Sequence, residues 1–178
     1  MSEFSESYHL KFSSPEDAAN LLRRSGLKGY AFPPGNGWIT FVVEDGSFEP
    51  DPLILDANED ILLHFVSAED HCWSFAIFDG PTQICAYRCD WGDGVEFDDS
   101  SYSSEALLPL IAPGGITTLA DLEVAFRLTS FDEILDVQPS QIFARAVGLE
   151  HYEWVAFDYV ARDYEETPEQ QRDIKKIP

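Results

Sequence analysis

The chain has 178 residues, of which 33 are acidic and 11 are basic, so its formal net charge is −22. Hydrophobic residues make up 44% of the chain and aromatic residues 13%, which is enough apolar material for a core and excludes global disorder. The charge argues against nucleic-acid and anionic membrane partners, because phosphates and anionic lipid surfaces attract basic proteins.

The acidity is concentrated in the middle of the chain. Residues 29–144 contain 21 acids but only two bases, Arg88 and Arg127. A field of this sign steers a cationic partner toward the protein. The same acidity also keeps a protein in solution, so the charge alone leaves both readings open.

Targeting and redox signals point to a cytoplasmic protein. The N-terminal ten residues lack a basic stretch followed by an apolar run, so we expect no secretory signal. Nowhere does the chain approach the roughly 18 consecutive apolar residues of a membrane helix. Three cysteines are an odd number without the spacing of a disulfide framework, which favours a reduced, cytoplasmic setting.

The first fifty residues predict a strand, a helix and a strand. Residues 8–12 alternate as a strand does. The helix that follows has Ser14 as its N-cap, Asp17 at the capping-box position and Gly26 where a left-handed residue closes a helix. Residues 37–44 predict the second strand.

The next forty residues predict an antiparallel meander. Strand-like runs cover residues 61–66, 73–79 and 82–91. Asp79 and Gly80 separate the last two runs and form a typical hairpin turn. Sequential strands with short connections favour antiparallel pairing.

The second half changes to a helical pattern. Residues 103–111 predict a short helix, and residues 118–138 predict a longer helical stretch. Ser130, followed by an acid three residues later, is a second start signal that would divide this stretch into two helices. Residues 139–149 begin with proline and reach Gly148, which predicts a further helix with a glycine stop.

The end of the chain predicts one more strand and a tail. Residues 151–160 carry aromatic side chains on both faces of an extended chain, which favours a central strand, the other reading being that one face meets a partner. We expect residues 1–166 to form a single α+β domain and residues 167–178 a short helical or frayed tail. The domain would contain a mainly antiparallel sheet of about five or six strands, with its helices grouped on one face.

Cys85 and Cys89 suggest a metal or redox pair but are too far apart for either. In a strand they lie on the same face, about 13 Å apart along the chain. A disulfide needs Cα atoms within about 6 Å, and zinc binds each thiolate at about 2.3 Å. We therefore predict that both are reduced core residues.

The acidic stretch that follows is the candidate binding surface. Its acids do not have the spacing of an EF-hand loop, so we expect no calcium site of that type. A solvated loop and a docking surface for a cationic partner both remain open. The candidate binding residues are Asp90, Trp91, Asp93, Glu96, Asp98 and Asp99.

A second candidate is the pair His71 and Cys72, preceded by two acids. A cysteine nucleophile finds its histidine in space rather than in sequence, so this pair could line an enzyme or ligand pocket. The ordinary reading places both residues where a loop enters a strand. Phosphate-binding, dinucleotide-binding, nucleophile-elbow and zinc-helix motifs are missing from the sequence, so we expect no cofactor and no metal.

Small size, a single domain, strong acidity and richness in tryptophan and tyrosine together resemble the bacterial toxin-neutralising immunity proteins. The resemblance is one of composition, and it implies a non-enzymatic protein that docks a cationic partner. The alternative is a small enzyme or ligand-binding domain with a pocket near His71 and Cys72.

Overall fold

The computed structural model describes residues 4–113, 115 and 117–178. Its strands are β1 (Phe4–Lys11), β2 (Gly29–Ala31), β3 (Trp38–Val43), β4 (Ile61–Ala68), β5 (Cys72–Asp79), β6 (Thr82–Asp90), β7 (Glu96–Asp98) and β8 (Lys175–Ile177). Its helices are α1 (Pro15–Ser25), α2 (Pro52–Ala57), α3 (Ser104–Leu107), the 3-10 helix η1 (Leu108–Leu110), α4 (Leu119–Ala125), α5 (Phe131–Val137), α6 (Pro139–Ala146) and α7 (Phe157–Glu166).

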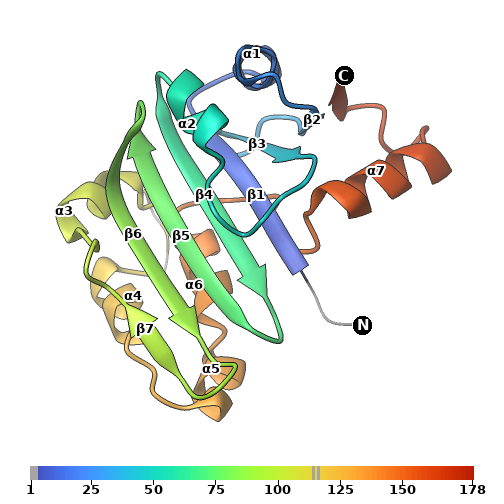
Figure 1. Cartoon of the computed structure of the whole chain (residues 1–178). Coiled ribbons are helices and arrows are strands. Elements are labelled where there is room, and N and C mark those ends of the chain that lie inside the picture. The colour runs from blue at the N-terminus through green and yellow to red at the C-terminus, as the bar shows by residue number, and fades with distance from the viewer. Residues whose placement is uncertain (1–3, 114, 116) are drawn as a thin grey trace.

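The strands form a single antiparallel sheet in the order β7-β6-β5-β4-β1-β3-β2-β8 (Figure 1). The α+β class and the antiparallel pairing are confirmed, but the sheet has eight strands instead of five or six. The strands that the sequence did not reveal, β2, β7 and β8, are each three residues long. So short a run does not display the alternation by which a strand is recognised.

The helices cover both faces of the sheet, so the prediction that they gather on one face is wrong. Leu62 of β4 packs in one core cluster with Leu22 of α1, whereas its neighbour Leu63 packs in another with Phe143 of α6. All six side chains of β3 are buried. Because side chains alternate between the two faces, such a strand needs cover on both sides. Figure 1 shows α1 and α2 on one face and α4 to α6 on the other.

Local end signals in the sequence are confirmed by the structure. Ser14 caps α1 and forms the reciprocal capping box with Asp17, and Gly26 closes the helix with a φ of 72°. The hairpin between β5 and β6 is present, but its two turn residues are Gly80 and Pro81, because Asp79 still pairs with Thr82; Gly80 has a φ of 55°. These positions depend on neighbouring residues alone, which is why the sequence identifies them.

Residues 151–160, predicted as a central strand, are instead a loop that leads into the start of α7. Phe157, Val160, Ala161 and Tyr164 are three or four residues apart, and together they pack against β2 and β3. This is the spacing of one helix face. The aromatic residues of this segment fit a period of two nearly as well as they fit the helical spacing, which is why the sequence pattern wrongly predicts a strand there.

The end of the chain belongs to the sheet. Turns follow α7, and β8 then pairs with β2 in the antiparallel register that places Ile177 opposite Gly29. The expectation of a helical or frayed tail is therefore wrong for these residues. Gly29 has room for no side chain, because a Cβ there would lie 2.1 Å from the carbonyl oxygen of Val42.

The larger core lies between the sheet and α4 to α6 and is built from stacked aromatic rings. The rings of Phe75 and Phe143 are nearly parallel, with their centroids 4.1 Å apart. Trp73, Tyr87 and Phe126 surround this pair, and the Tyr87 hydroxyl donates to the carbonyl oxygen of Phe126 at 2.6 Å. The core thereby fixes β5 and β6, the strands that carry the candidate site.

Cys85 and Cys89 lie on β6 and face this core, as the alternation predicts. Both are buried and free, as is Cys72 at the start of β5. Burial raises the pKa of each of the three thiols, which keeps them in the unreactive protonated form.

We therefore expect all three thiols to be protected in the folded protein. An aromatic disulfide reagent at pH 8 should label them at least about a hundred times more slowly in the native protein than in guanidinium chloride, since reaction requires an exposed thiolate. Rapid labelling of a thiol in the native protein would contradict their burial.

Candidate functional site

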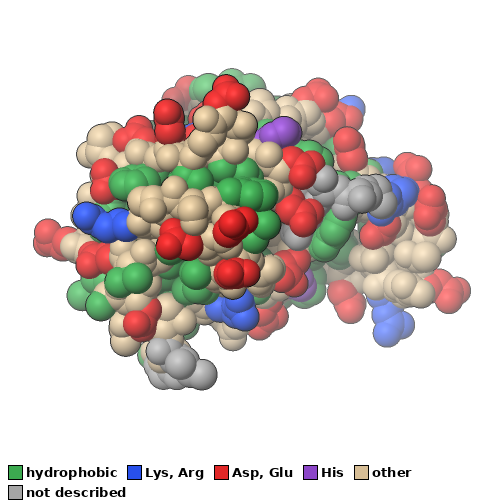
Figure 2. Space-filling model, turned by 90° about the horizontal axis from the view of Figure 1, so that it is seen from below, with side chains coloured by type: hydrophobic (Ala, Val, Ile, Leu, Met, Phe, Trp, Pro, Cys, Tyr) green, Lys and Arg blue, Asp and Glu red, His purple; other side chains and the backbone are tan. Residues whose placement is uncertain are grey.

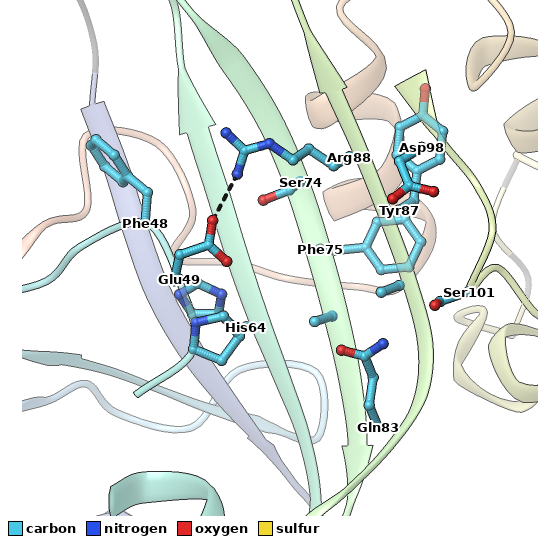
Figure 3. Close-up of a pocket in the computed structure, with 13 residues that line it drawn as sticks. Phe48, Glu49, His64, Ser74, Phe75, Gln83, Tyr87, Arg88, Asp98 and Ser101 are labelled. Atoms are coloured by element: carbon cyan, nitrogen blue, oxygen red, sulfur yellow. Dashed lines mark hydrogen bonds and ion pairs between the residues drawn. The ribbon is translucent and has the colours of Figure 1, made fainter. Parts of the chain in front are cut away.

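The face of the sheet that carries α1 and α2 is only partly covered, and an open cavity of about 220 Å³ lies on its uncovered part. Strands β4, β5 and β6 form its floor, and the loop between β3 and α2 forms one side (Figure 3). Its polar side chains come from five separate parts of the chain. These polar side chains are Glu49, His64, Ser74, Gln83, Arg88, Asp98 and Ser101.

The strand register explains why several acids share this face. Arg88 lies opposite Ser74 on β5 and opposite Asp98 on β7. Asp90, two residues after Arg88, lies opposite Glu96 of β7. Residues two apart on a strand point to the same side, so these acids surround Arg88 on one face.

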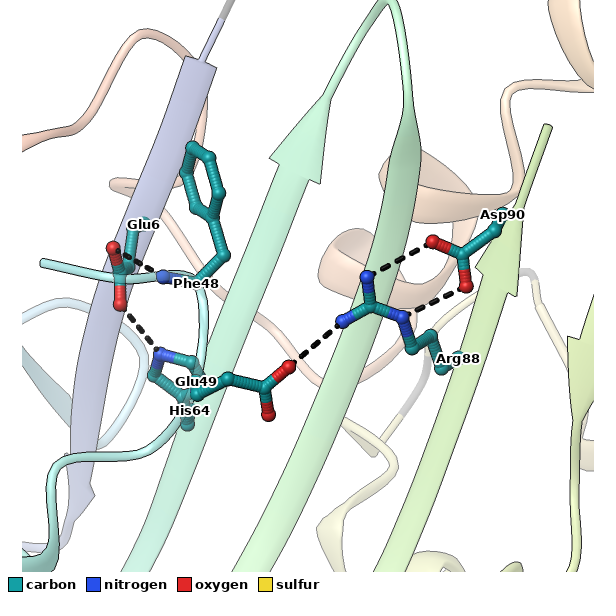
Figure 4. A network of polar contacts seen from close by, with 6 residues as sticks. All are labelled: Glu6, Phe48, Glu49, His64, Arg88 and Asp90. Carbon is teal, nitrogen blue, oxygen red and sulfur yellow. Dashed lines mark hydrogen bonds and ion pairs between the residues drawn. The ribbon is translucent and has the colours of Figure 1, made fainter. Parts of the chain in front are cut away.

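Arg88 is held by carboxylates from two directions (Figure 4). Its Nε and one terminal nitrogen donate to the two oxygens of Asp90 at 2.7 and 2.9 Å, and the other terminal nitrogen donates to Glu49 at 3.1 Å. The hydrogen bonds with Asp90 raise the pKa of Arg88. Because three of its five N–H donors are engaged and two carboxylates balance its charge, Arg88 is a poor receptor for an anionic ligand.

A buried polar pair anchors the loop beside the cavity. Nε2 of His64 and Oε1 of Glu6 are 3.1 Å apart, and the two side chains are only 2% and 8% exposed. The backbone N–H of Phe48 donates to the other oxygen of Glu6 at 3.1 Å. The backbone N–H of Asp51 donates to the Tyr8 hydroxyl at 2.9 Å. These bonds fix the loop that carries Glu49 over β1 and β4.

The structure places the predicted acids along an edge of the sheet. Asp90 ends β6, and Glu96 and Asp98 belong to β7, so part of the expected loop is a strand. Asp93 is exposed in the turn between these strands. Asp99 is exposed, with Oδ2 3.9 Å from Arg127. Glu96 and Asp98 join the Arg88 face, whereas Asp99 turns toward a base of its own.

Asp98 also shapes the end of β7. One oxygen of its side chain accepts a hydrogen bond from the backbone N–H of Ser100 at 2.9 Å. The hydrogen bonds with Ser100 lower the pKa of Asp98 and keep it charged at neutral pH.

Trp91 is half-buried at the rim of this edge. Its indole N–H donates to the carbonyl oxygen of Glu69 at 3.2 Å, and its ring lies 6.4 Å from that of Phe131. Phe131 itself is 44% exposed, and Phe97 of β7 is 40% exposed. Aromatic surface is therefore present at this edge, but on the opposite face of the sheet from Arg88, because Phe97 stacks on Tyr87 and Trp91 packs against the same core.

His71 and Cys72 are not brought together in a pocket. Cys72 is buried against Val66 and Ala68, while His71 is exposed in the turn between β4 and β5. Among the described residues, neither His71 nor Cys72 lines any of five surface cavities, the cavity beside Arg88 included. The ordinary reading, a turn entering a strand, matches their positions.

Sequence reasoning missed Glu6, Glu49, His64 and Arg88 as parts of this site. Arg88 had one signal, since it is one of two bases in a long acidic stretch and shares a strand face with Asp90. The others had none, because Glu49 meets Arg88 across 39 residues and Glu6 meets His64 across 58.

Residues 4–113, 115 and 117–178 contain neither a metal-binding cluster nor a membrane-spanning helix. No three His, Cys, Asp or Glu side chains there are grouped so as to hold a metal ion. No helix in the same ranges has the length and apolar character needed to cross a membrane. Comparisons of the chain with protein-family models, with curated proteins and with solved structures found no match.

Proposed function

We propose that this protein is a non-enzymatic binding domain that docks a cationic protein through the edge of the sheet formed by β6 and β7. One observation carries the proposal: β7 ends the sheet, all three of its residues are exposed, and two of them are acids. An exposed edge strand offers unpaired backbone groups to an incoming chain. The acids would attract that chain when it is basic.

The charge around this edge supports a cationic partner. Glu49, Asp90, Glu96 and Asp98 face the same side as Arg88, the single base among them. Their sum is strongly negative even with Arg88 fully charged. Figure 2 shows one end of the molecule, where acidic side chains outnumber basic ones and lie among hydrophobic side chains. Charge gives steering and aromatic surface gives affinity in such interfaces.

The composition that resembles immunity proteins suggests the partner's class, a cationic toxin held inactive in the cytoplasm. The three buried, reduced thiols fit that compartment. Binding at a sheet edge requires no catalytic group, so the proposal does not depend on a reaction centre.

The test replaces the four most exposed acids of this edge. The variant Asp93→Asn, Glu96→Gln, Asp98→Asn and Asp99→Asn removes four negative charges while keeping similar side-chain shapes. The matched control is Glu165→Gln, Glu166→Gln, Glu169→Gln and Asp173→Asn, which removes four exposed acids beyond the opposite end of the sheet. Both variants should fold as the wild type does, as circular dichroism would check.

Cationic proteins recovered from the native host at low salt should bind the wild type and the control alike. We expect their recovery on the edge variant to fall about tenfold, since steering charges change association rates by that order or more. Equal recovery on the edge variant and the control would contradict this docking surface. Failure to recover a cationic partner with the wild type would contradict the proposed function itself.

A further inference from the structure

A second cavity, of about 410 Å³, lies where the start of β1, the loop between β3 and α2 and the first turn of α7 meet. A backbone hydrogen bond joins β1 to the residues just before α7, since the N–H of Glu6 donates to the carbonyl oxygen of Val155 at 2.9 Å. The N–H of Val155 donates to Oγ of Ser5 at 3.2 Å. The cavity is therefore bounded by fixed backbone on two sides.

Four aromatic side chains line this cavity: Phe4, Phe48, Phe157 and Tyr159. The rings of Phe4 and Phe48 are stacked within 19° of parallel, with centroids 6.1 Å apart. The ring of Phe157 packs against the ring of Tyr30, with the two ring centroids 5.4 Å apart. All four are half-buried, so each keeps some ring surface open to the cavity or to solvent.

Three carboxylates complete the lining: Glu6, Asp45 and Asp158. Glu6 is almost buried and is held in one orientation by His64 and by the N–H of Phe48 (Figure 4). Asp45 and Asp158 are exposed at the rim. Gly46 leaves the room that the Glu6 carboxylate occupies, because a Cβ at Gly46 would lie 2.3 Å from Oε2.

Among the described residues, the lining contains no Lys, Arg or His. His64 reaches Glu6 from β4, outside the cavity. Arg162 lies over the ring of Tyr159, 5.7 Å from its centre, so that ring already has one cation beside it. The positive end of α7 also faces this region, and Asp158 in the first turn of the helix offsets it.

We infer that this cavity binds the ammonium group of a lysine side chain, an assignment that rests on the proposed cationic partner and names the group it inserts. Aromatic faces attract cations, most strongly when the cation leaves water, and the carboxylates add direct charge complementarity. Both oxygens of Glu6 already accept a hydrogen bond, which hinders the two-pronged approach of a guanidinium. An ammonium is a compact charge with three donors and needs only one free acceptor site.

The inference can be tested without the partner, by titrating the full-length protein with N-acetyl-lysine-N′-methylamide and following backbone amides by NMR. The amides of Gly46, Phe48 and Asp158 should shift and saturate. The norleucine analogue, which has the same alkyl length without the charge, should leave them in place. Equal shifts with norleucine, or no saturable shift with lysine, would overturn the inference.

Two pairs of variants separate the two forces. Phe48→Leu removes an aromatic face but keeps an apolar side chain, and it should weaken lysine binding about 2- to 30-fold, the range of one cation–π contact. Its control is Phe131→Leu, on the opposite side of the sheet, which should bind as the wild type does. The double variant Asp45→Asn, Asp158→Asn should weaken lysine binding at least about threefold. Its control, the double variant Asp132→Asn, Asp136→Asn, should bind lysine as the wild type does.

Identical affinities for each variant and its control would overturn the inference. Tetramethylammonium chloride distinguishes a protein side chain from a free small cation as the ligand. Tighter binding of this ion than of the lysine probe would overturn the assignment to lysine. The proposed function has its own test at the β7 edge, so a failure of the docking surface and a failure of the lysine site give different results.

Discussion

Replacing Phe143 by alanine is expected to lower the free energy of unfolding by about 3–5 kcal/mol, the usual loss for a large side chain deleted from a core. Phe143 is fully buried on α6 and stacks on Phe75, with Trp73 and Phe126 close by. Its removal would leave a cavity in the centre of the aromatic cluster. Urea unfolding followed by tryptophan fluorescence measures the change.

The control is Phe131→Ala, because Phe131 is 44% exposed and its loss leaves no closed cavity. This variant should cost less than about 1 kcal/mol, as surface substitutions usually do. Similar losses for Phe131→Ala and Phe143→Ala would contradict the packing of α6 on the sheet.

The stability of the protein is expected to fall as the pH drops below about 6.5, and His9 should account for a large share of the fall. His9 is fully buried on β1, with its two ring nitrogens 2.9 Å from Oγ of Ser7 and 3.0 Å from Oγ1 of Thr40. Burial lowers the pKa of His9 from 6.5 to about 3. In the unfolded chain the ring takes up a proton near pH 6.5.

Between these two pKa values the unfolded chain therefore binds a proton that the folded protein does not. The free energy of unfolding should then decline by up to about 1.4 kcal/mol for each pH unit in that window, with no contribution from His9 at higher pH. Burial also lowers the pKa of His151, which acts in the same direction.

The variant His9→Gln isolates this effect, because glutamine is neutral throughout. Its absolute stability changes as well, so the slope of unfolding free energy against pH from 7 to 4 is the quantity to compare. The slope of His9→Gln should be shallower than that of the wild type. The control His71→Gln, at an exposed site, should have the same slope as the wild type. Parallel slopes for the wild type and His9→Gln would contradict the low pKa of His9.

Features set by neighbouring residues could be predicted from the sequence. The start and end of α1 follow from Ser14, Asp17 and Gly26, and the β5–β6 hairpin follows from Gly80. The positions of Cys85 and Cys89 on one strand face follow from a period of two. In each case the physical cause lies within a few residues of the effect.

Features set by distant contacts could not be predicted. The pairing of β8 with β2 joins residues at the two ends of the chain, and neither strand is long enough to have a recognisable pattern. The candidate sites depend on equally distant meetings, such as Glu49 with Arg88 and Glu6 with His64. The acids of β7 were identified by their abundance, but the face they share was not, since it depends on register.

The most direct test of the docking surface is the association rate of the recovered cationic partner, measured by stopped flow from low to moderate sodium chloride. For the wild type, the rate should fall steeply as salt rises, because screening shortens the reach of the acidic field to about 8–10 Å. For the variant neutralised at Asp93, Glu96, Asp98 and Asp99, the rate at low salt should be about tenfold lower and its salt dependence much flatter. Indistinguishable rates and salt dependences for the two proteins would contradict docking at the edge formed by β6 and β7.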